Sequence, residues 1–177
     1  MRVLRFFTVL MVISAIFFYN TTWFQSMFSD DFYKNIAEIQ FDVLHKGNTI
    51  SIPIKYKYKT CYDLGIAVPG KHLMAYRKEG PGRLHYKFIS DGNMLTEGFT
   101  RPVSRHNMGG NDDYTALLLM VFDLPLKENV RNVILELEVV EPFTFLAEYK
   151  GQTSIIINPN YEPKVGGCYN ESLRIIQ

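Results

Sequence analysis

The sequence predicts an all-β domain, a two-sheet sandwich, that follows one N-terminal transmembrane helix. Three observations carry this prediction. Residues 6–24 form an uncharged and largely apolar run directly after two arginines. From residue 38 onward, apolar residues recur with a period of two in about eight or nine short segments separated by turn signals. The segments after the apolar run lack a helical period, which is typical of two packed sheets.

The uncharged run at residues 6–24 sets the expected cellular address. It contains nineteen residues from Phe6 to Phe24, few of them polar. At a rise of about 1.5 Å per residue, a helix of this length is close to the thickness of a bilayer core, about 30 Å. Tyr19, Trp23 and Phe24 stand near its end, where aromatic rings favour the membrane interface. The run therefore predicts one membrane-spanning helix.

Charge and side-chain size around this run predict its orientation and its fate. Arg2 and Arg5 precede it, and the positive-inside tendency places them in the cytoplasm and the rest of the chain outside. Phe17, Phe18 and Tyr19 stand where a signal peptidase requires small residues, so an uncleaved signal-anchor is favoured. A cleaved signal peptide is the second interpretation, and a buried core helix is the third. The expected location is the inner (plasma) membrane, crossed once, with the bulk of the chain in the periplasm.

These signals divide the chain into five parts. The parts are a cytoplasmic segment at 1–5, a transmembrane signal-anchor at 6–24, a juxtamembrane linker with a short helix at 25–37, a β-sandwich domain at 38–164 and a C-terminal tail at 165–177. In the linker, Ser29 precedes two acidic residues, a combination that favours a helix start. This helix is expected to reach about Ala37.

Apolar residues alternate with polar ones along most of the predicted sandwich. Strands are expected at 39–43, 50–58, 62–68, 83–89, 114–124, 132–141, 143–149 and 155–157. Pro53 has no N–H to donate to a ladder, so its strand is expected at a sheet edge. The lysines beside it, Lys55, Lys57 and Lys59, are interpreted as a solvated strand face, with an anionic-lipid stripe as the alternative. Residues 114–124 are almost continuously apolar, which predicts a central strand covered on both faces.

Charge and residue spacing argue against several functions. The chain has 19 Lys and Arg against 18 Asp and Glu, so no basic surface for nucleic acid is expected. The 4 histidines are scattered and lack metal-ligand spacing, so neither a metal nor another cofactor is expected. The serines stand outside catalytic motifs, and the chain is expected not to be an enzyme.

The longest weakly patterned segment, 93–113, holds the candidate binding residues. They are the charged and histidine side chains of one loop: Arg101, Arg105, His106, Asp112 and Asp113. Functional residues often lie in loops carried by a rigid scaffold, which makes this group the candidate binding site. A polar surface excursion without function is the simpler interpretation of the same residues.

The two cysteines, Cys61 and Cys168, allow two interpretations. They are either unpaired thiols, one of them buried in a strand, or a disulfide formed in an oxidising compartment. A loop of that length would stabilise the fold by about 4–5 kcal/mol in the chain-entropy model. Their spacing is not that of a zinc site.

A few turn residues and the strand rhythm carry a family resemblance. The matching stretches are Phe41-Asp42-Val43, Gly47 to Ile54, Tyr62-Asp63-Leu64 and Val139 to Phe143. They resemble small immunoglobulin-like domains of uncharacterised bacterial envelope proteins. The resemblance implies an immunoglobulin-like β-sandwich over most of 38–164 and an envelope location, and it transfers no functional residue. Antibody-type domains carry a core tryptophan between two cysteines, whereas the sole tryptophan here, Trp23, belongs to the predicted membrane segment.

The leading functional hypothesis is a non-enzymatic envelope protein that binds another envelope protein. Its sandwich would present either loop ends or an exposed strand edge to that partner. A ligand-binding or enzymatic domain that uses the 101–113 loop is the first alternative. A structural subunit of a membrane complex is the second alternative.

Overall fold

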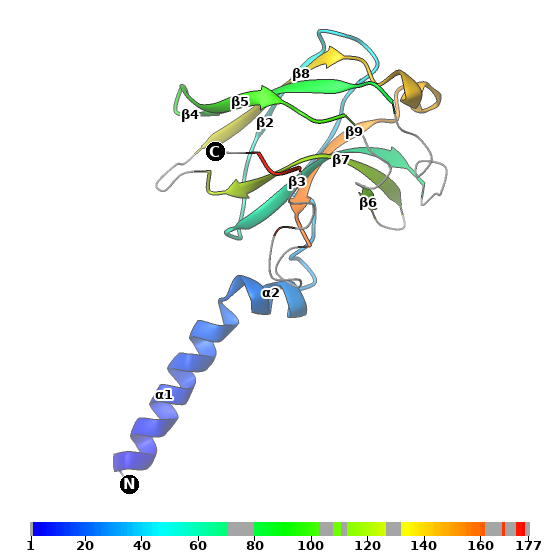
Figure 1. Cartoon of the computed structure of the whole chain (residues 1–177). Helices are drawn as coiled ribbons and strands as arrows, with labels where there is room; N and C mark the ends of the chain where they lie inside the picture. Colours follow the sequence, from blue (N-terminus) through cyan, green and yellow to red (C-terminus); the bar gives the residue numbers. More distant parts are fainter. Residues whose placement is uncertain are drawn as a thin grey trace.

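A pair of N-terminal helices leads into a two-sheet β-sandwich in the computed structural model of the chain (Figure 1). The structure describes residues 2–70, 80–102, 108–110, 113–126, 132–161, 168 and 173–175. The helices are α1 (Arg2–Tyr19) and α2 (Thr22–Phe28). The strands are β1 (Ala37–Gln40), β2 (Thr49–Pro53), β3 (Thr60–Pro69), β4 (Arg83–Ser90), β5 (Asn93–Phe99), β6 (Met108–Gly110), β7 (Tyr114–Leu124), β8 (Val133–Glu141) and β9 (Ser154–Pro159).

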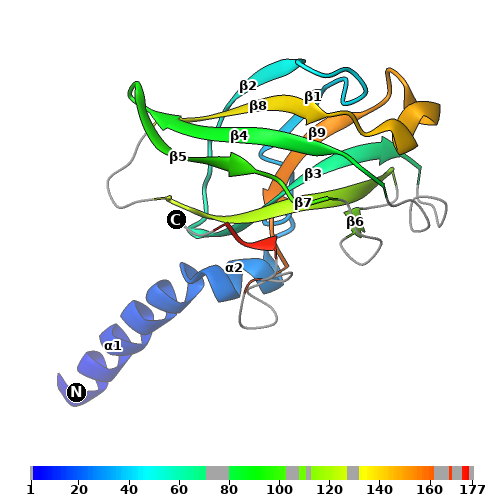
Figure 2. The ribbon, with the colours of Figure 1, turned by 45° about the horizontal axis from the view of Figure 1, so that its top comes forward.

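The strands form two antiparallel sheets packed face to face, as Figure 2 shows. The five-stranded sheet has the order β1-β9-β3-β7-β6, and the four-stranded sheet has the order β2-β8-β4-β5. The two-sheet sandwich that the sequence predicts is therefore confirmed. Strands that are early in the chain pair with late ones in a nested order: β1 with β9, β2 with β8, and β3 with β7. The chain consequently crosses from one sheet to the other between β1, β2, β3 and β4.

The core lies between the two sheets and is built from the inward-facing half of each strand. In β4 and β8 every second residue is buried, which is the pattern of a sheet with one wet face. Aromatic rings fill the middle of this core. Phe88 of β4 and Phe122 of β7 reach across it, with ring centroids 5.0 Å apart. Tyr62 of β3 stacks on Phe122 from within the same sheet.

The five-stranded sheet is covered on both faces, unlike its partner. Nearly all residues of β3 and β7 are buried, as the apolar run at 114–124 predicts. A second apolar cluster lies on the outer face of this sheet, with Leu118, Val121 and Ile156 among its members. The described C-terminal residues Cys168 and Leu173 join that cluster. The tail expected at 165–177 therefore contributes to the outer layer of the sandwich.

Two expected strands differ from the observed elements. The strand that contains Pro53 is an edge strand, as predicted, but it ends at Pro53 and does not continue to 58. The segment expected as a strand at 143–149 is a 3₁₀ helix, η2 (Thr144–Tyr149). Phe143 and Leu146 are buried three residues apart, which suits a 3₁₀ turn and not a strand. Conversely, β5 and β6 lie in the segment 93–113 for which no strand is expected.

The helix predicted from Ser29 to about Ala37 is wrong, because the observed short helix precedes it. α2 ends at Phe28, and Ser29 is its C-terminal boundary residue. The aromatic residue Phe32 is fully buried and packs on Tyr58, with ring centroids 4.6 Å apart. This tertiary contact directs the linker toward the domain, and it is favoured over the helix that the local sequence predicts.

The continuous helix predicted for 6–24 is also wrong, since the chain bends between α1 and α2. Within the described residues, neither helix alone has the length and apolarity needed to cross a bilayer. Phe6–Tyr19 and Thr22–Phe28 meet that requirement only as a pair bent by 72°. Polar side chains cause the break: Asn20 Nδ2 donates to Ile16 O at 2.7 Å, and Thr21 Oγ1 donates to Phe18 O at 2.7 Å. Such side chains compete with the backbone hydrogen bonds of the helix.

Candidate functional site

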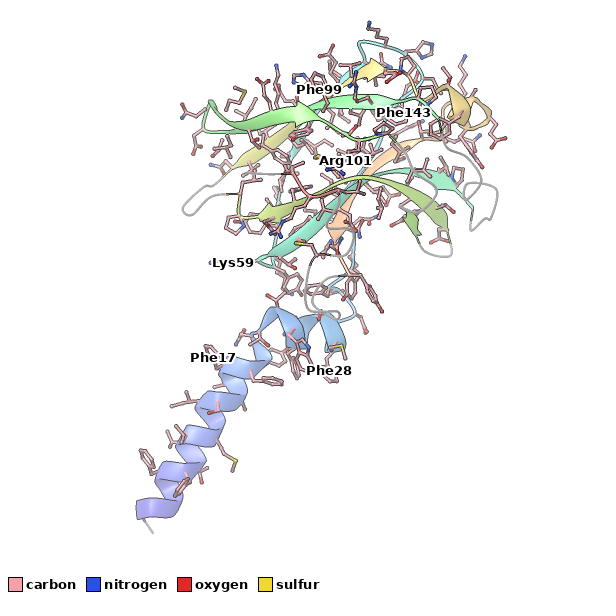
Figure 3. The ribbon with its side chains drawn as sticks, viewed as in Figure 1. Phe17, Phe28, Lys59, Phe99, Arg101 and Phe143 are labelled. Carbon is pink, nitrogen blue, oxygen red and sulfur yellow. A yellow bond between two sulfur atoms is a disulfide. The ribbon has the colours of Figure 1, made fainter. Side chains whose placement is uncertain are left out.

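The candidate residues of the 101–113 loop are only partly described by the structure. Arg105, His106 and Asp112 lie outside the described residues. Arg101 is exposed and follows β5 of the four-stranded sheet (Figure 3). Asp113 is exposed, precedes β7 of the five-stranded sheet, and its carbonyl accepts a hydrogen bond from Gly70 N at 2.8 Å. The two described members thus belong to segments of different sheets.

A pocket on the outer face of the five-stranded sheet is the strongest candidate site. Its volume is about 630 Å³, a size typical of ligand pockets. It combines an apolar floor, a carboxylate with an amide, and tyrosine rings. The lining residues are Tyr33, Asp63, Gly109, Gly110, Tyr114, Ala116, Leu118, Ile156, Asn158, Pro159 and Tyr161.

The floor of the pocket consists of outward-facing residues of β6, β7 and β9. Leu118 and Ile156 supply its apolar surface, and Gly109 lies directly opposite Ala116 in the β6–β7 ladder. Residues opposite each other in an antiparallel pair point to the same face, so the missing side chain of Gly109 leaves room above Ala116. A Cβ at Gly109 would meet only Leu118 Cδ2, at 3.9 Å. The glycine is therefore a source of pocket volume.

Gly110, its neighbour, has a different role. Its φ of +135° is unfavourable for side chains, and an added Cβ would lie 2.4 Å from Tyr114 O. Only glycine fits where β6 approaches the start of β7 this closely. Gly110 therefore allows β6 to approach Tyr114 at the rim of the pocket this closely.

One carboxylate is held in the wall of the pocket by a buried amide. Asp63 of β3 is 6% exposed and accepts a hydrogen bond from Asn160 Nδ2 at 2.5 Å. Asn160 is fully buried, and its backbone N–H donates to Cys61 O at 2.9 Å. Asn158 lies directly opposite Asp63 in the β3–β9 ladder. The register of two strands far apart in sequence thus places an acid and an amide side by side.

Tyrosine rings form the rim. Tyr33, from the linker after α2, stacks on Tyr161, which follows β9, with ring centroids 5.6 Å apart. Tyr114 Oη donates to Asn35 Oδ1 at 3.1 Å. Burial raises the pKa of Tyr33 and of Tyr114, so both phenols stay protonated and able to donate at neutral pH. The linker and the end of β9 therefore complete a pocket that begins on the sheet.

A disulfide joins Cys61 of β3 to Cys168 close to this pocket. The pairing is the second of the two interpretations of the cysteines. Asp123 lies beside the disulfide, and it forms an ion pair with Arg174. The ligating atoms of Cys61, Asp123 and Cys168 all lie within 4.8 Å of one another. The two sulfurs are bonded to each other and offer no thiolate to a metal ion. The disulfide instead links the C-terminal segment covalently to the sheet.

The outer face of the four-stranded sheet has a second, smaller hollow of about 240 Å³. Charged side chains dominate it, with Lys87 opposite Glu136 in the β4–β8 ladder. His85 Nε2 lies 3.3 Å from Glu97 Oε2 at the neighbouring strand pair. Alternating opposite charges of this kind are typical of a solvated sheet face. The hollow therefore needs no ligand to explain its composition.

Sequence reasoning does not identify the residues of the main pocket. Asp63, Tyr114 and Ile156 stand in segments that the sequence marks as ordinary strands. Asp63 and Tyr114 each stand near the start of an apolar run, and Ile156 stands inside one, and both placements are common in strands. Gly109 and Gly110, inside the segment 93–113, are the described lining residues that the candidate loop brings to the pocket. Comparisons with protein-family models, with curated proteins and with solved structures find no match to this chain.

Proposed function

We propose that this protein is a non-enzymatic, membrane-anchored binding module of the cell envelope, and that its pocket engages a segment of another envelope protein. The observation that carries the proposal is the pocket between Gly109, Leu118, Asp63 and the tyrosine rim. The remaining arguments concern its chemistry, its partner and its location.

The composition of the pocket favours binding over catalysis. Its described lining includes one carboxylate, Asp63, and contains neither histidine, nor serine, nor cysteine. Asp63 is tied to Asn160, an arrangement that holds an acceptor in place. Nucleophilic and acid–base catalysis both need a base beside a nucleophile or a second titrating group. The described lining instead offers fixed hydrogen-bonding groups around an apolar floor.

A protein segment suits this surface best. Tyrosine rings provide large contact area with little loss of side-chain entropy and keep a polar hydroxyl for backbone groups, which is why they are common in binding sites. The apolar floor at Leu118 and Ile156 accepts an aliphatic side chain. Asp63 and Asn158 at the wall provide an acceptor and an amide for the backbone of the bound segment.

The N-terminal helices and the disulfide support the envelope location. Most of the large hydrophobic side chains that the structure leaves exposed lie on α1 and α2. Exposed apolar surface on this scale is typical of membrane contact. The Cys61–Cys168 disulfide favours an oxidising compartment such as the periplasm. Both observations agree with Arg2 and Arg5 in the cytoplasm and the sandwich outside.

For the type of sandwich, we propose a jelly roll and not the immunoglobulin-like arrangement that the family resemblance implies. The nested pairing supports this, because β1 and β2 lie in opposite sheets, as do β3 and β4. Immunoglobulin domains place their first two strands in one sheet. In a jelly roll two Greek keys wind the chain alternately through both sheets.

A small-molecule ligand is the second candidate occupant of the same pocket. The supporting observation is that Gly109 and Gly110, two described residues of the 101–113 loop, line the pocket. This candidate corresponds to the first alternative from the sequence, a ligand-binding domain that uses the 101–113 loop. Binding would then depend on the pocket and not require a macromolecular partner.

A blocking substitution at Gly109 tests the pocket. Gly109→Trp is expected to fill the space above Ala116 with little strain on the fold, because the added Cβ has only one ordinary contact. In cells that carry a photo-crosslinking residue at Tyr161, a specific crosslinked partner is expected with the native glycine and is expected to decrease about tenfold with the tryptophan, equivalent to about 1.4 kcal/mol.

Ser51→Trp is the matched control, because Ser51 is exposed on the outer face of the four-stranded sheet. It adds the same ring far from the pocket and should leave the crosslink unchanged. Equal crosslinking by all three proteins would reject the pocket as the binding site. Loss of a crosslink to a small-molecule photoprobe, with protein crosslinks unaffected, would favour the second candidate.

A further inference from the structure

The bend between α1 and α2 is built from side-chain hydrogen bonds. Thr21 closes the end of α1 through its hydroxyl and also caps α2, accepting a hydrogen bond from Phe24 N at 3.2 Å. Gln25 of α2 reaches back, and its Nε2 donates to Tyr19 O at 2.8 Å. These capping hydrogen bonds and the hydrogen bond between the two helices keep the angle between the helices defined. That angle is 72°. α2 is consequently directed across the axis of α1.

The domain holds one side of α2. Thr22 Oγ1 donates to Lys59 O at 3.3 Å, and Ser26 is 2% exposed. At about 100° per residue, Thr22, Gln25 and Ser26 lie on one side of the helix. The views agree that this helix lies under the five-stranded sheet (Figures 1 and 2). The polar side of α2 therefore faces the sandwich.

The other side of α2 is apolar and open. Trp23 and Met27 are each 48% exposed, and Phe28 is 67% exposed. Figure 3 shows Phe28 on the side of α2 that faces away from the sandwich. Phe24 joins this side to α1, since its ring centroid lies 4.6 Å from that of Phe28 and 5.3 Å from that of Tyr19. The result is an aromatic surface at the junction of the two helices.

Two lysines of the sandwich lie near the junction of the two helices. Lys59 is held next to Thr22 through its backbone, and Figure 3 places it at the edge of the sandwich nearest α2. Lys57 Nζ lies 4.9 Å from the centroid of the Tyr58 ring, and interaction with Tyr58 raises the pKa of Lys57. Both lysines are exposed.

The acidic groups nearby, Asp30 and Asp31, interact with lysines of the same region. Asp31 pairs with Lys34, Oδ1 to Nζ, at 2.5 Å, and both side chains are exposed. Asp31 also attracts Lys57 more weakly, and Asp30 attracts Lys34. Counting Lys34, Lys57 and Lys59 against Asp30 and Asp31 leaves one positive charge in this region. The excess is small, so its effect should appear only close to a charged surface.

We infer that α2 lies in the plane of the membrane–water interface, with its Trp23–Met27–Phe28 side in the headgroup region and with Lys57 and Lys59 against anionic lipid headgroups. The inference rests on the proposed membrane anchoring by α1. A bend of 72° places α2 nearly parallel to the surface of a bilayer that α1 enters along its normal, aromatic side chains favour this depth, and lysines favour an anionic surface. The arrangement would hold the outer face of the five-stranded sheet toward the membrane.

The chain carries its own probe for this inference, because Trp23 is its only tryptophan. The full chain is reconstituted in vesicles of phosphatidylcholine, with or without phosphatidylglycerol. Some of the phosphatidylcholine is brominated either near the headgroup or near the chain end. We expect headgroup-proximal bromine to quench Trp23 emission roughly twofold more than terminal bromine, as for residues at the interface. Stronger quenching by terminal bromine would overturn the inference, since α2 would then continue the span.

A charge-matched pair of variants tests the lysines. In phosphatidylglycerol-containing vesicles, Lys57→Gln with Lys59→Gln is expected to increase the acrylamide quenching of Trp23 by roughly twofold. Lys46→Gln with Lys87→Gln removes the same charge from the turn before β2 and from β4, and should change nothing. Equal effects of the two double variants would overturn the role of the lysines.

Flotation of the vesicles separates this inference from the proposed anchoring. If the chain does not float with the vesicles, the proposed anchoring by α1 fails, and the inference fails with it. If the chain floats while Trp23 is quenched by acrylamide and not by either brominated lipid, the anchoring stands and the interfacial position of α2 is overturned. Flotation with headgroup-proximal quenching supports both.

Discussion

At the scale of single residues, Tyr62 has a strongly raised pKa. Its ring is fully buried, and its hydroxyl donates to Tyr58 O at 2.9 Å. Burial raises the pKa of Tyr62 to about 12, against an ordinary value near 10. The ionised phenolate is disfavoured because the core solvates it poorly. The side chain is therefore a reporter of the integrity of the sandwich at high pH.

We predict that Tyr62 makes the fold sensitive to alkali. Between pH 10 and 12 the unfolded chain loses the Tyr62 proton while the folded chain keeps it, so the free energy of unfolding falls as pH rises. The stabilisation is fully present below pH 10. The limiting slope for one such group is about 1.4 kcal/mol per pH unit. Urea unfolding at a series of alkaline pH values measures it.

Tyr62→Phe is the control for this prediction. The substitution should reduce the fall in the free energy of unfolding between pH 10 and 12. At neutral pH it should lower that free energy by about 1 kcal/mol, because the carbonyl of Tyr58 loses its hydrogen-bond donor. Other buried tyrosines, Tyr86 among them, have raised pKa values and keep part of the slope. An alkaline profile unchanged by the substitution would contradict the assignment to Tyr62.

At the scale of elements, β7 contributes side chains both to the core and to the outer face of its sheet. Leu119 belongs to the core between the sheets, whereas Leu118 belongs to the outer cluster and lines the pocket. A bulge opposite Leu64 and Gly65 shifts the ladder here, so Leu119 and Met120 both face the core. The sequence of β7 shows a continuous apolar run because both of its faces are covered, and the bulge only changes which residues face the core.

We predict different costs for the same substitution at these neighbours. Leu119→Ala should lower the free energy of unfolding by about 2–5 kcal/mol, because it leaves a cavity in a closed core. Leu118→Ala should cost less, because the pocket beside it already admits water, and should weaken partner binding instead. Urea unfolding of the detergent-solubilised proteins, followed by circular dichroism, measures the first effect, and crosslinking measures the second. A larger loss of stability for Leu118→Ala would contradict this division of β7.

At the scale of the whole molecule, a disulfide links β3 to the C-terminal segment. Cys61 and Cys168 are 107 residues apart, and the disulfide spans most of the sandwich. Arg174 adds an ion pair with Asp123, and Ile175 N donates to Val121 O at 3.0 Å. These contacts hold the C-terminal segment against the outer face of the five-stranded sheet, next to the pocket.

We predict that this link is a major source of stability. Cys61→Ala with Cys168→Ala should lower the free energy of unfolding by about 4–5 kcal/mol in the chain-entropy model, since a long loop is released in the unfolded state. Wild-type protein in reductant should unfold at the same urea concentration as the double variant in oxidising buffer. If reductant leaves the wild-type midpoint unchanged, the link does not stabilise the fold.

The errors of the sequence-based predictions share a cause that particular residues make clear. Ser29 with two acids is a sound local helix signal, yet Phe32 packs into the domain and no helix forms after Ser29. Apolar residues alternate in the segment 143–149, which suits a strand. Phe143 and Leu146, three residues apart, are the ones that are buried, and this spacing favours the 3₁₀ helix η2. In each case a local pattern allows two conformations, and a contact distant in sequence selects one of them.

The sequence by itself determined the class of the molecule, because a period of two in apolar residues favours a sheet with one buried face. Only the tertiary structure decided the pocket. Asp63, Gly109 and Ile156 come from strands whose proximity depends on the β9-β3-β7-β6 order, and the linker adds Tyr33 from outside the sheet. Strand order and register arise from pairings between distant segments, which no local pattern of residues encodes.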